Sequence, residues 1–278
     1  MTQSDLPQYY DEMDRWNRGE NDFSTYSGHD QNSVHRFLTD PVSGAFSPMT
    51  IFTLLDPWLP AERPLQGLDA GCGYGGACFR NQEVHGGHWT GVTIAPSQWQ
   101  RATQQAQARG LEASVEFLLQ SYDAPLPGEY NTVIAIESLI HSPDPARTLQ
   151  NLVAHMAKGA RLMIVDDMPV SNLTAQDAQL LEDFKKMWRC PVAPSAQIWT
   201  SLADVHGLTK IVEQDLSAKM RPRNEAQLDE TLHGLRAQQA QKAEQGYGLL
   251  AEAEIGGVHL ERLQQRGAIQ YMLLVFEA

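Results

Sequence analysis

Short apolar runs alternate with polar, helix-forming segments through the middle of the chain. The runs cover 65–70, 88–94, 114–119, 131–136 and 161–165, and each has the length of a strand. The segment 95–110 has Pro96 at a first helical position and Gly110 at its far end, as a helix would. Strand and helix repeated in this order predict a parallel sheet with right-handed crossovers and helices on both faces.

The alternation continues toward the end of the chain. Segment 142–159 carries apolar residues at helical spacing, namely Leu149, Leu152, Val153 and Met156. We predict a further helix near 196–206 and strands at 209–216 and 268–278. A helix at 225–244 places Leu228, Leu232 and Leu235 on one face. This face predicts packing onto the domain, with a lid or a contact in a homodimer as the alternatives.

The first 60 residues differ from the rest because they are polar and aromatic and are broken by prolines. We predict two parts. Residues 1–60 form an N-terminal helical segment that acts as a lid and contacts the substrate. Residues 61–278 form one α/β domain, with a helical insertion at about 222–266.

The acidic balance of the chain restricts its partners. The formal net charge is −13 over 278 residues. Nucleic acids and anionic membranes require a face rich in Lys and Arg, so we expect a small-molecule partner and no nucleic acid. No apolar run approaches the roughly 20 residues of a membrane span. The acidic N-terminus and three cysteines without a C-x-x-C pair predict a reducing, cytoplasmic location.

The stretch LDAGCGYGG at 68–76 follows the first predicted strand. Ligands of an open parallel sheet bind beyond the carboxyl ends of its strands, and glycine lets a ligand approach the backbone closely. Gly71, Gly73 and Gly76 fit the G-x-G-x-x-G spacing of a dinucleotide site, but the second strand ends in Thr93 and Ile94 without the acid that such a site needs. No P-loop lysine follows, which disfavours a nucleoside triphosphate.

This stretch resembles the first motif of class I S-adenosylmethionine-dependent methyltransferases, D/E-x-G-x-G-x-G, which Asp69, Gly71, Gly73 and Gly75 match position by position. GVTIAPSQ (91–98) and NTVIAIESLIH (131–141) resemble motifs of the subgroup that holds cyclopropane fatty acid synthases and sterol, tocopherol and prenyl C-methyltransferases. The resemblance covers about 60–170. It implies a Rossmann-like, doubly wound sheet of seven mostly parallel strands, with S-adenosylmethionine as cofactor and S-adenosylhomocysteine as product.

The resemblance also implies which residues lie beside the cofactor. We expect Asp69, Gly71, Cys72, Gly73, Gly75, Thr93, Gln98, Ser121, Tyr122 and Glu137 in that role. Thr93 and Gln98 stand where many families place a ribose-binding acid. The third strand also lacks the usual acid at its end, and Asn131 replaces an acid at the start of the fourth.

Two residues after the fourth strand are candidates for catalysis. In the resembling C-methyltransferases a glutamate at the position of Glu137 lies beside the acceptor, where it would stabilise a carbocation and remove a proton afterwards. His141 would instead serve as general base for a heteroatom acceptor. The alternative interpretations are a carboxylate at a helix N-terminus and a buried structural histidine. We expect no metal; the pair of histidines in VHGGH (84–88) is interpreted as a turn.

Contacts with the acceptor are expected from residues outside the motifs. Tyr9, Trp16 and Tyr26 of the N-terminal segment offer aromatic faces to a cation. Asp166 follows the fifth strand, and Trp188 and Arg189 lie in a predicted loop at 187–191. Arg189, Arg221 and Arg223 would suit an anionic group such as a prenyl diphosphate. Packing and solvation are the alternatives for each of these residues.

We therefore predict methyl transfer to a small molecule, first of all to carbon of an apolar or isoprenoid acceptor. An O- or N-methyltransferase of a small metabolite is the alternative. A further alternative is a non-catalytic subunit that binds S-adenosylmethionine. An acyl-lipid acceptor ranks below the first two because the acidic chain offers no clear docking surface for it.

Overall fold

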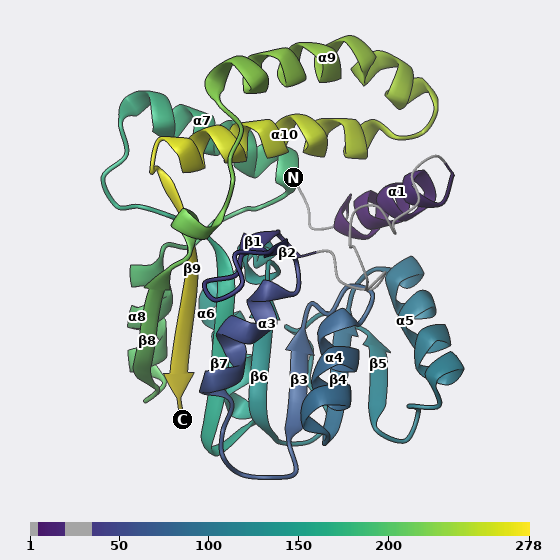
Figure 1. Ribbon diagram of the computed structural model, residues 1–278, viewed down its shortest axis with the longest axis vertical. Coiled ribbons are helices and arrows are strands. Elements are labelled where there is room, and N and C mark those ends of the chain that lie inside the picture. Colours follow the sequence, from purple (N-terminus) through teal and green to yellow (C-terminus); the bar gives the residue numbers. More distant parts are fainter. Residues whose placement is uncertain (1–4, 20–34) are drawn as a thin grey trace.

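The computed structural model describes residues 5–19 and 35–278. One sheet of seven strands has the order β5-β4-β3-β6-β7-β9-β8 (Figure 1). The strands are β3 (Gln66–Ala70), β4 (His88–Thr93), β5 (Val115–Leu119), β6 (Tyr130–Ile136), β7 (Met156–Pro169), β8 (Thr209–Asp215) and β9 (Ile269–Glu277). β9 is antiparallel to its two neighbours, and the other pairs are parallel. The predicted doubly wound α/β fold is confirmed.

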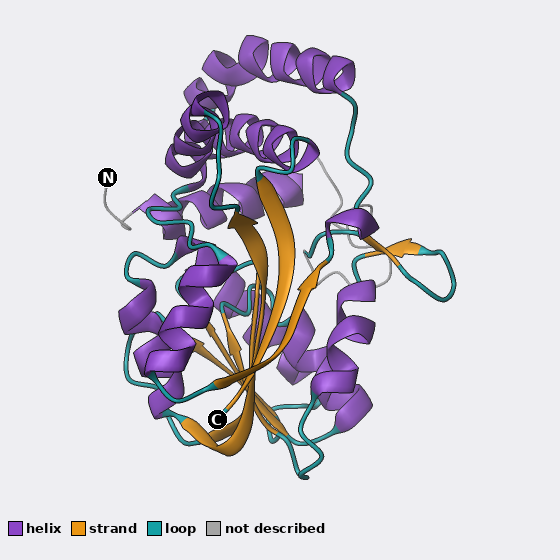
Figure 2. Ribbon diagram, turned by 90° about the vertical axis from the view of Figure 1, so that its left-hand side faces the viewer, coloured by secondary structure: helices purple, strands orange, loops and turns teal. Residues whose placement is uncertain are grey.

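Helices cover both faces of this sheet (Figure 2). α3 (Thr50–Leu55), α4 (Gly76–His85) and α5 (Pro96–Arg109) pack on one face, where Phe52, Phe79 and Ala102 join the larger core cluster. α6 (Pro145–Ala154) and α8 (Ala196–Val205) pack on the other face through Leu149, Leu152 and Trp199. The short elements are β1 (Leu38–Thr39), β2 (Phe46–Ser47), η2 (Asp56–Trp58), η3 (Leu139–His141) and η4 (Ser217–Lys219).

Local sequence signals set several helix ends. Pro96 begins α5, and Gly110 ends it in the left-handed conformation at φ +67°. The carboxylate of Asp144 accepts a hydrogen bond from the N–H of Arg147 at the start of α6. Asn224 and Gln227 form a capping box at the start of α9. The ends of α5 and α9 lie within a residue of the predicted ones. α6 is shorter than the predicted 142–159 and ends at Ala154, because Met156 begins β7.

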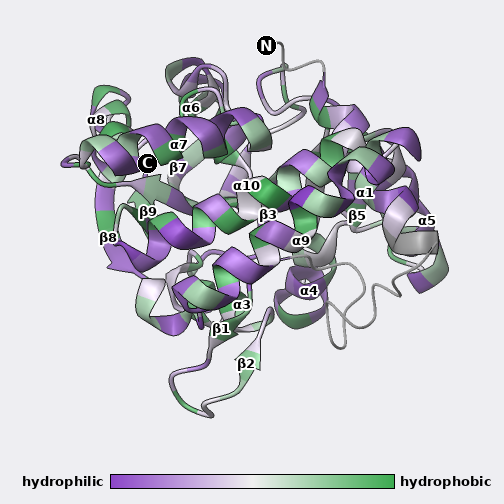
Figure 3. Ribbon diagram, turned by 90° about the horizontal axis from the view of Figure 1, so that it is seen from above, coloured by the Kyte–Doolittle hydropathy of each residue, from purple (hydrophilic) through white to green (hydrophobic). Residues whose placement is uncertain are grey.

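Four helices lie over the carboxyl ends of the parallel strands (Figures 1 and 3). They are α1 (Leu6–Gly19), α7 (Ala175–Trp188), α9 (Glu225–Glu244) and α10 (Gly248–Gln265). α7 was not predicted from the sequence. The loop expected at 187–191 begins later than predicted, because Met187 and Trp188 are the last residues of α7. None of the helices in the described ranges is long and apolar enough to cross a membrane.

The apolar face of α9 packs within the chain. Leu228 and Leu232 are buried against Ile255 and Val258 of α10, and Leu235 packs against the same cluster. The face that suggested a homodimer is therefore covered by α10 and no longer supports one.

Candidate functional site

The glycine loop leaves β3 at the edge where the parallel strands end. The N–H groups of Gly71 and Cys72 both donate to the carbonyl of Val92 at the end of β4, at 3.0 and 2.9 Å. Gly71 has φ +96°, and a Cβ on it would lie 2.4 Å from the Cβ of Ser138. The loop therefore needs glycine here both for its conformation and for its contact with the segment after β6.

A cavity of about 430 Å³ opens beside this loop. Gly73 has φ +53°, and a Cβ on it would meet no protein atom within 4 Å, although Gly73 lines the cavity. The space that this glycine leaves belongs to the cavity. Of the residues predicted to bind the cofactor, the cavity is lined by Gly71, Cys72, Gly73, Thr93, Gln98, Ser121, Tyr122 and Glu137.

Two of these polar residues form a buried pair. The hydroxyl of Thr93 donates to Oε1 of Gln98 at 2.8 Å, and the N–H of Ala95 donates to the same hydroxyl oxygen. The pairing fixes the Gln98 amide, so that its orientation at the cavity wall is set in advance. On the neighbouring strand end, the hydroxyl of Tyr122 donates to the carbonyl of Ser138 at 3.3 Å.

Asp69 and Gly75 lie behind the cavity wall. Asp69 is buried and accepts a weak hydrogen bond from the thiol of Cys78 at 3.7 Å. Burial raises the pKa of its carboxyl to about 7. Gly75 caps α4 at φ +84°, with Phe117 so close that a Cβ would lie 2.4 Å from its ring. Both residues shape the loop, and their contact with a cofactor stays a prediction.

Glu137 stands directly after β6 in a left-handed conformation, with φ +52°. Its N–H donates to the carbonyl of Val165, which ties the turn to β7. Its Oε1 accepts hydrogen bonds from the N–H of Arg36 at 2.9 Å and from the hydroxyl of Tyr271 at 2.7 Å. The carboxylate lines the cavity. A strained backbone and two donors therefore hold this group at one place.

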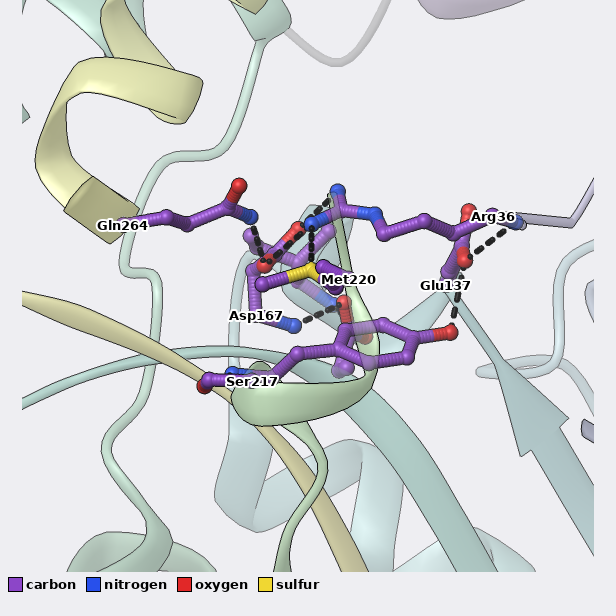
Figure 4. A network of polar contacts seen from close by, with 9 residues as sticks. Arg36, Glu137, Asp167, Ser217, Met220 and Gln264 are labelled. Atoms are coloured by element: carbon purple, nitrogen blue, oxygen red, sulfur yellow. Dashed lines mark hydrogen bonds and ion pairs between the residues drawn. The ribbon is translucent and has the colours of Figure 1, made fainter. Parts of the chain in front are cut away.

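A buried ionic network supports Glu137 from behind (Figure 4). The guanidinium of Arg36 makes a bidentate pair with Asp167, at 3.1 and 2.6 Å, and lies over the ring of Tyr271. The side-chain amide of Gln264 donates to Asp167 at 2.7 Å. The charge of Arg36 is thus balanced by Asp167, and Arg36 contacts Glu137 through its backbone N–H and not through its guanidinium.

Asp166 does not line the cavity but supports the turn that carries both catalytic candidates. Its two carboxyl oxygens accept the N–H groups of Ile140, at 2.9 Å, and of Asp167, at 3.0 Å. Burial and the neighbouring Asp167 raise the pKa of Asp166 well above its ordinary value. The predicted contact of Asp166 with the acceptor stays a prediction.

His141 ends η3 and lines the cavity. Burial lowers the pKa of its imidazole to about 4, so the ring is neutral near pH 7. Nδ1 lies 3.4 Å from the carbonyl of Arg189, which can only accept a hydrogen bond. The thiol of Cys190 lies 3.6 Å from the same Nδ1. A proton on Nδ1 would donate to the carbonyl and leave the lone pair on Nε2. The ring of Tyr10 packs edge-on against His141.

The roof of the cavity comes from α1. Leu6, Pro7, Tyr9, Tyr10 and Met13 line the cavity from this helix. Trp16 lies away from the cavity, with its ring edge-on to Tyr247 and the ammonium of Lys242 over its face. Tyr26 lies outside the described residues. Tyr9 is thus the predicted N-terminal aromatic that the structure brings to the cavity, and Tyr10 joins it.

The three predicted anion-binding arginines are not brought together. Arg189 pairs with Glu252 at 2.7 Å, and Arg223 pairs with Glu261 at 2.6 Å. Arg221 lies over the ring of Phe46 and donates to Thr39. None of these three side chains lines the cavity, whereas Trp188 does. Their role in binding an acceptor stays a prediction without support from these positions.

Comparison with known proteins identifies the family. Residues 62–229 match the model of a methyltransferase domain, which is more than half of the chain. The chain belongs to the methyltransferase domain family. S-adenosylmethionine is therefore its cofactor.

Curated relatives match over part of their length. Ajmaline N-methyltransferase of Rauvolfia serpentina is 30% identical over 48% of this chain and 50% of its own. Tocopherol O-methyltransferase of Arabidopsis thaliana is 30% identical over 56% of this chain and 47% of its own. The chain thus spans about half the length of the curated relatives it matches.

Solved structures agree over nearly the whole chain. A mycolic acid cyclopropane synthase, crystallised with S-adenosylhomocysteine, has a TM-score of 0.76 at 16% identity and covers 99% of this chain and 98% of its own. A geranyl diphosphate methyltransferase has a TM-score of 0.69 at 16% identity, over 97% and 99%. At this identity the likeness shows the fold.

The cavity fits the cofactor of the family. The glycine loop leaves open space at Gly73, and the hydrogen-bonding side chains of Thr93, Gln98 and Ser121 line the same cavity. Among residues 5–19 and 35–278, no group of three His, Cys, Asp or Glu side chains could hold a metal ion.

Sequence reasoning missed the residues that support Glu137 from distant segments. Arg36 precedes β1, Tyr271 lies in β9, and Gln264 lies in the last turn of α10. Tyr271 carried one weak signal, because a tyrosine interrupts the apolar run of the terminal strand. Arg36 and Gln264 stand in segments where the pattern gives no reason to single out a polar residue.

Proposed function

We propose that this methyltransferase transfers its methyl group to carbon of a small apolar acceptor, such as an isoprenoid alkene, with Glu137 facing the charge that develops there. The main support for this proposal is the position of the Glu137 carboxylate. It is held by the Arg36 N–H and the Tyr271 hydroxyl at a cavity that also borders the glycine loop.

Charge balance explains why a carboxylate belongs at this place. The sulfonium of S-adenosylmethionine supplies an activated methyl group, and a neutral acceptor that receives it becomes positive. A preorganised carboxylate stabilises such a charge without reorganising, most strongly where water is excluded. Glu137 is suited to this role because Arg36 is neutralised by Asp167 and does not cancel its charge. Its basic oxygens could then take the proton that the cation loses.

The remaining wall of the cavity fits an apolar acceptor. Tyr9 and Tyr10 of α1, Ile136 of β6 and Trp188 of α7 all line it. Aromatic faces attract a cation by roughly 0.5–2 kcal/mol each when they are positioned beside it. α1 closes the cavity from above, which limits the water that could compete for a carbocation. The named substrate of the geranyl diphosphate methyltransferase supports an isoprenoid acceptor. The proposed acceptor carries no diphosphate, because the arginines that would bind one do not line the cavity, namely Arg189, Arg221 and Arg223.

Methyl transfer to oxygen or nitrogen is the second candidate, and His141 is the observation that favours it. The neutral ring at the cavity wall has its lone pair on Nε2, which could accept the proton of a phenol or an amine. The names of the relatives, an O- and an N-methyltransferase, support this candidate. A histidine whose pKa is about 4 is a weak base near neutral pH, which places this function second.

Labelled cofactor separates the two functions. The purified chain is incubated with S-adenosylmethionine that carries a ¹³C-methyl group and with a panel of prenyl alcohols, tocopherol-type phenols and tertiary amines. We expect the ¹³C NMR shift of the product to place the new methyl group on carbon. A methyl group found only on oxygen or nitrogen would reject the first function in favour of the second.

Two variants assign the roles of the residues. Glu137→Gln should reduce turnover by about 10²-fold or more with S-adenosylhomocysteine affinity nearly unchanged. Glu62→Gln, which alters an exposed carboxylate, is the matched control. If His141→Asn reduced turnover far more than Glu137→Gln, His141 would be the catalytic residue.

A further inference from the structure

Buried carboxylates make several of the contacts that hold the described part of α1 to the body of the protein, beside the ring contacts of Tyr10 and Trp16. Its buried side chains are Leu6, Glu12 and Asp14, so two of these three are acidic. The four hydrophobic clusters of the described chain are built without any residue of α1. A helix with so little apolar burial belongs to the less stable parts of a fold, which open most readily.

Glu12 makes the most specific of these contacts. It is 2% exposed, and its Oε2 accepts the N–H groups of Leu249 at 2.9 Å and Leu250 at 3.1 Å. Its Oε1 accepts a hydrogen bond from Gln8 one turn earlier in α1. The first N–H groups of a helix have no partner within that helix, and they carry the positive end of its dipole. Tyr247, the N-cap of α10, provides no side-chain cap, so Glu12 supplies one from another helix.

The opposite side of α1 rests on the part of the domain that carries the glycine loop. Asp14 accepts a hydrogen bond from the hydroxyl of Tyr74 and lies 3.7 Å from the guanidinium of Arg101 on α5. The N–H of Ser97 donates to Asp11. α1 therefore bridges α5 and α10, as Figure 1 shows, and carries Tyr9, Tyr10 and Met13 over the cavity between them.

We propose that Glu12 is a positioning residue that latches the α1 roof onto the N-terminus of α10, and that release of this latch lets S-adenosylmethionine enter and S-adenosylhomocysteine leave. Met13, next to Glu12, and Tyr9, one turn earlier, line the cavity, so the latch and the roof move as one helix. The N–H groups of α10 bind the carboxylate well enough to hold α1 closed. When the Glu12 carboxylate leaves, these N–H groups can bind water instead.

The test follows S-adenosylhomocysteine, so it does not depend on the acceptor. The dissociation rate of this ligand from the full chain is measured by stopped flow for the wild type, Glu12→Gln and Glu12→Ala. Amide hydrogen exchange of 6–16 is measured in the same bound state. We expect Glu12→Ala to raise the dissociation rate about tenfold or more and to speed exchange in α1, because two hydrogen bonds to a charged group are lost. Glu12→Gln keeps an acceptor oxygen but loses the charge. Its dissociation rate should therefore fall between those of the wild type and Glu12→Ala.

Asn224→Ala is the matched control, because Asn224 caps the start of α9 through Gln227, whereas Lys242, which contacts Trp16 of α1, lies near the other end of that helix. It should leave the dissociation rate and the exchange of α1 unchanged. The proposal is overturned if Glu12→Ala or the milder Glu12→Gln is folded and binds the ligand but releases it at the wild-type rate. It is also overturned if Asn224→Ala accelerates release as much, since the effect would then be one of general stability.

Discussion

The hydroxyl of Tyr271 donates a hydrogen bond to Oε1 of Glu137 at 2.7 Å, although 134 positions separate the two residues in the sequence. Burial and the Glu137 charge raise the pKa of Tyr271 well above its ordinary value, so this hydroxyl keeps its proton and remains a donor. Its ring also lies under the guanidinium of Arg36, at 4.8 Å. Tyr271 thereby positions both the carboxylate and the residue that supplies its second hydrogen bond.

Tyr271→Phe should therefore lower kcat without weakening cofactor binding. The ring and its contact with Arg36 remain, and only one donor to Glu137 is lost. A hydrogen bond to a charged group contributes about 1.5–3 kcal/mol, which corresponds to a fall in kcat of roughly tenfold or more. Steady-state kinetics on an identified acceptor and calorimetry with S-adenosylhomocysteine measure the two effects. Tyr130→Phe, which removes a hydroxyl that donates to Pro127, is the control. Equal kinetics for both variants would contradict the role of Tyr271.

Gly73→Ala should abolish cofactor binding at little cost in stability. The new methyl group meets no protein atom within 4 Å and enters the cavity instead. The backbone cost of alanine at φ +53° is about 1–2 kcal/mol. Gly110→Ala carries the same kind of cost at φ +67°, also in open space, but at the end of α5. Thermal unfolding should show similar losses for the two variants, and titration with S-adenosylhomocysteine should separate them. Normal affinity in Gly73→Ala would remove the glycine loop from the binding site.

The part of this site that was predictable lies close to the motifs in sequence. Thr93 ends a strand, and Gly71, Gly73, Glu137 and His141 each follow one. Parallel strands bring their carboxyl ends to one edge. This arrangement needs only the order of the elements.

The supporting residues were not predictable because they depend on long-range register. Tyr271 reaches the site because β9 runs antiparallel to β7 with Tyr271 opposite Asp167. A shift of one residue would turn the ring to the other face of the sheet. In the sequence, Glu12 looks like any acidic residue on a surface helix. Its partner, the N-terminus of α10, lies more than two hundred residues later in the chain.

Asp166 provides a prediction about the turn that carries Glu137 and His141. Burial raises the pKa of this carboxyl well above its ordinary value, and Asp166→Asn keeps one of the two acceptor oxygens, so this variant should lose less stability than Asp166→Ala. Asp166→Ala leaves the N–H groups of Ile140 and Asp167 without an acceptor. Such a loss costs about 1–3 kcal/mol per buried group. Urea unfolding of the two variants at pH 7 measures the difference, and equal destabilisation would show that Asp166 acts through its charge.

The pKa of His141 predicts how stability changes with pH. Its folded value of about 4 lies below the ordinary 6.5, so between these values the unfolded chain binds more protons than the folded chain. Stability contributed by the neutral ring is therefore complete above about pH 6.5 and is lost as the pH falls toward 4. Asp69, whose carboxyl pKa is raised to about 7, also changes the stability with pH, so the difference between a variant and the wild type isolates His141. His141→Asn keeps a donor for the Arg189 carbonyl and cannot take up a proton. It should gain on the order of 1–2 kcal/mol relative to the wild type between pH 7 and pH 5. Urea unfolding at both pH values measures this gain, with His88→Asn at an exposed position as the comparison. A gain that is the same for both variants would mean that burial does not hold His141 neutral.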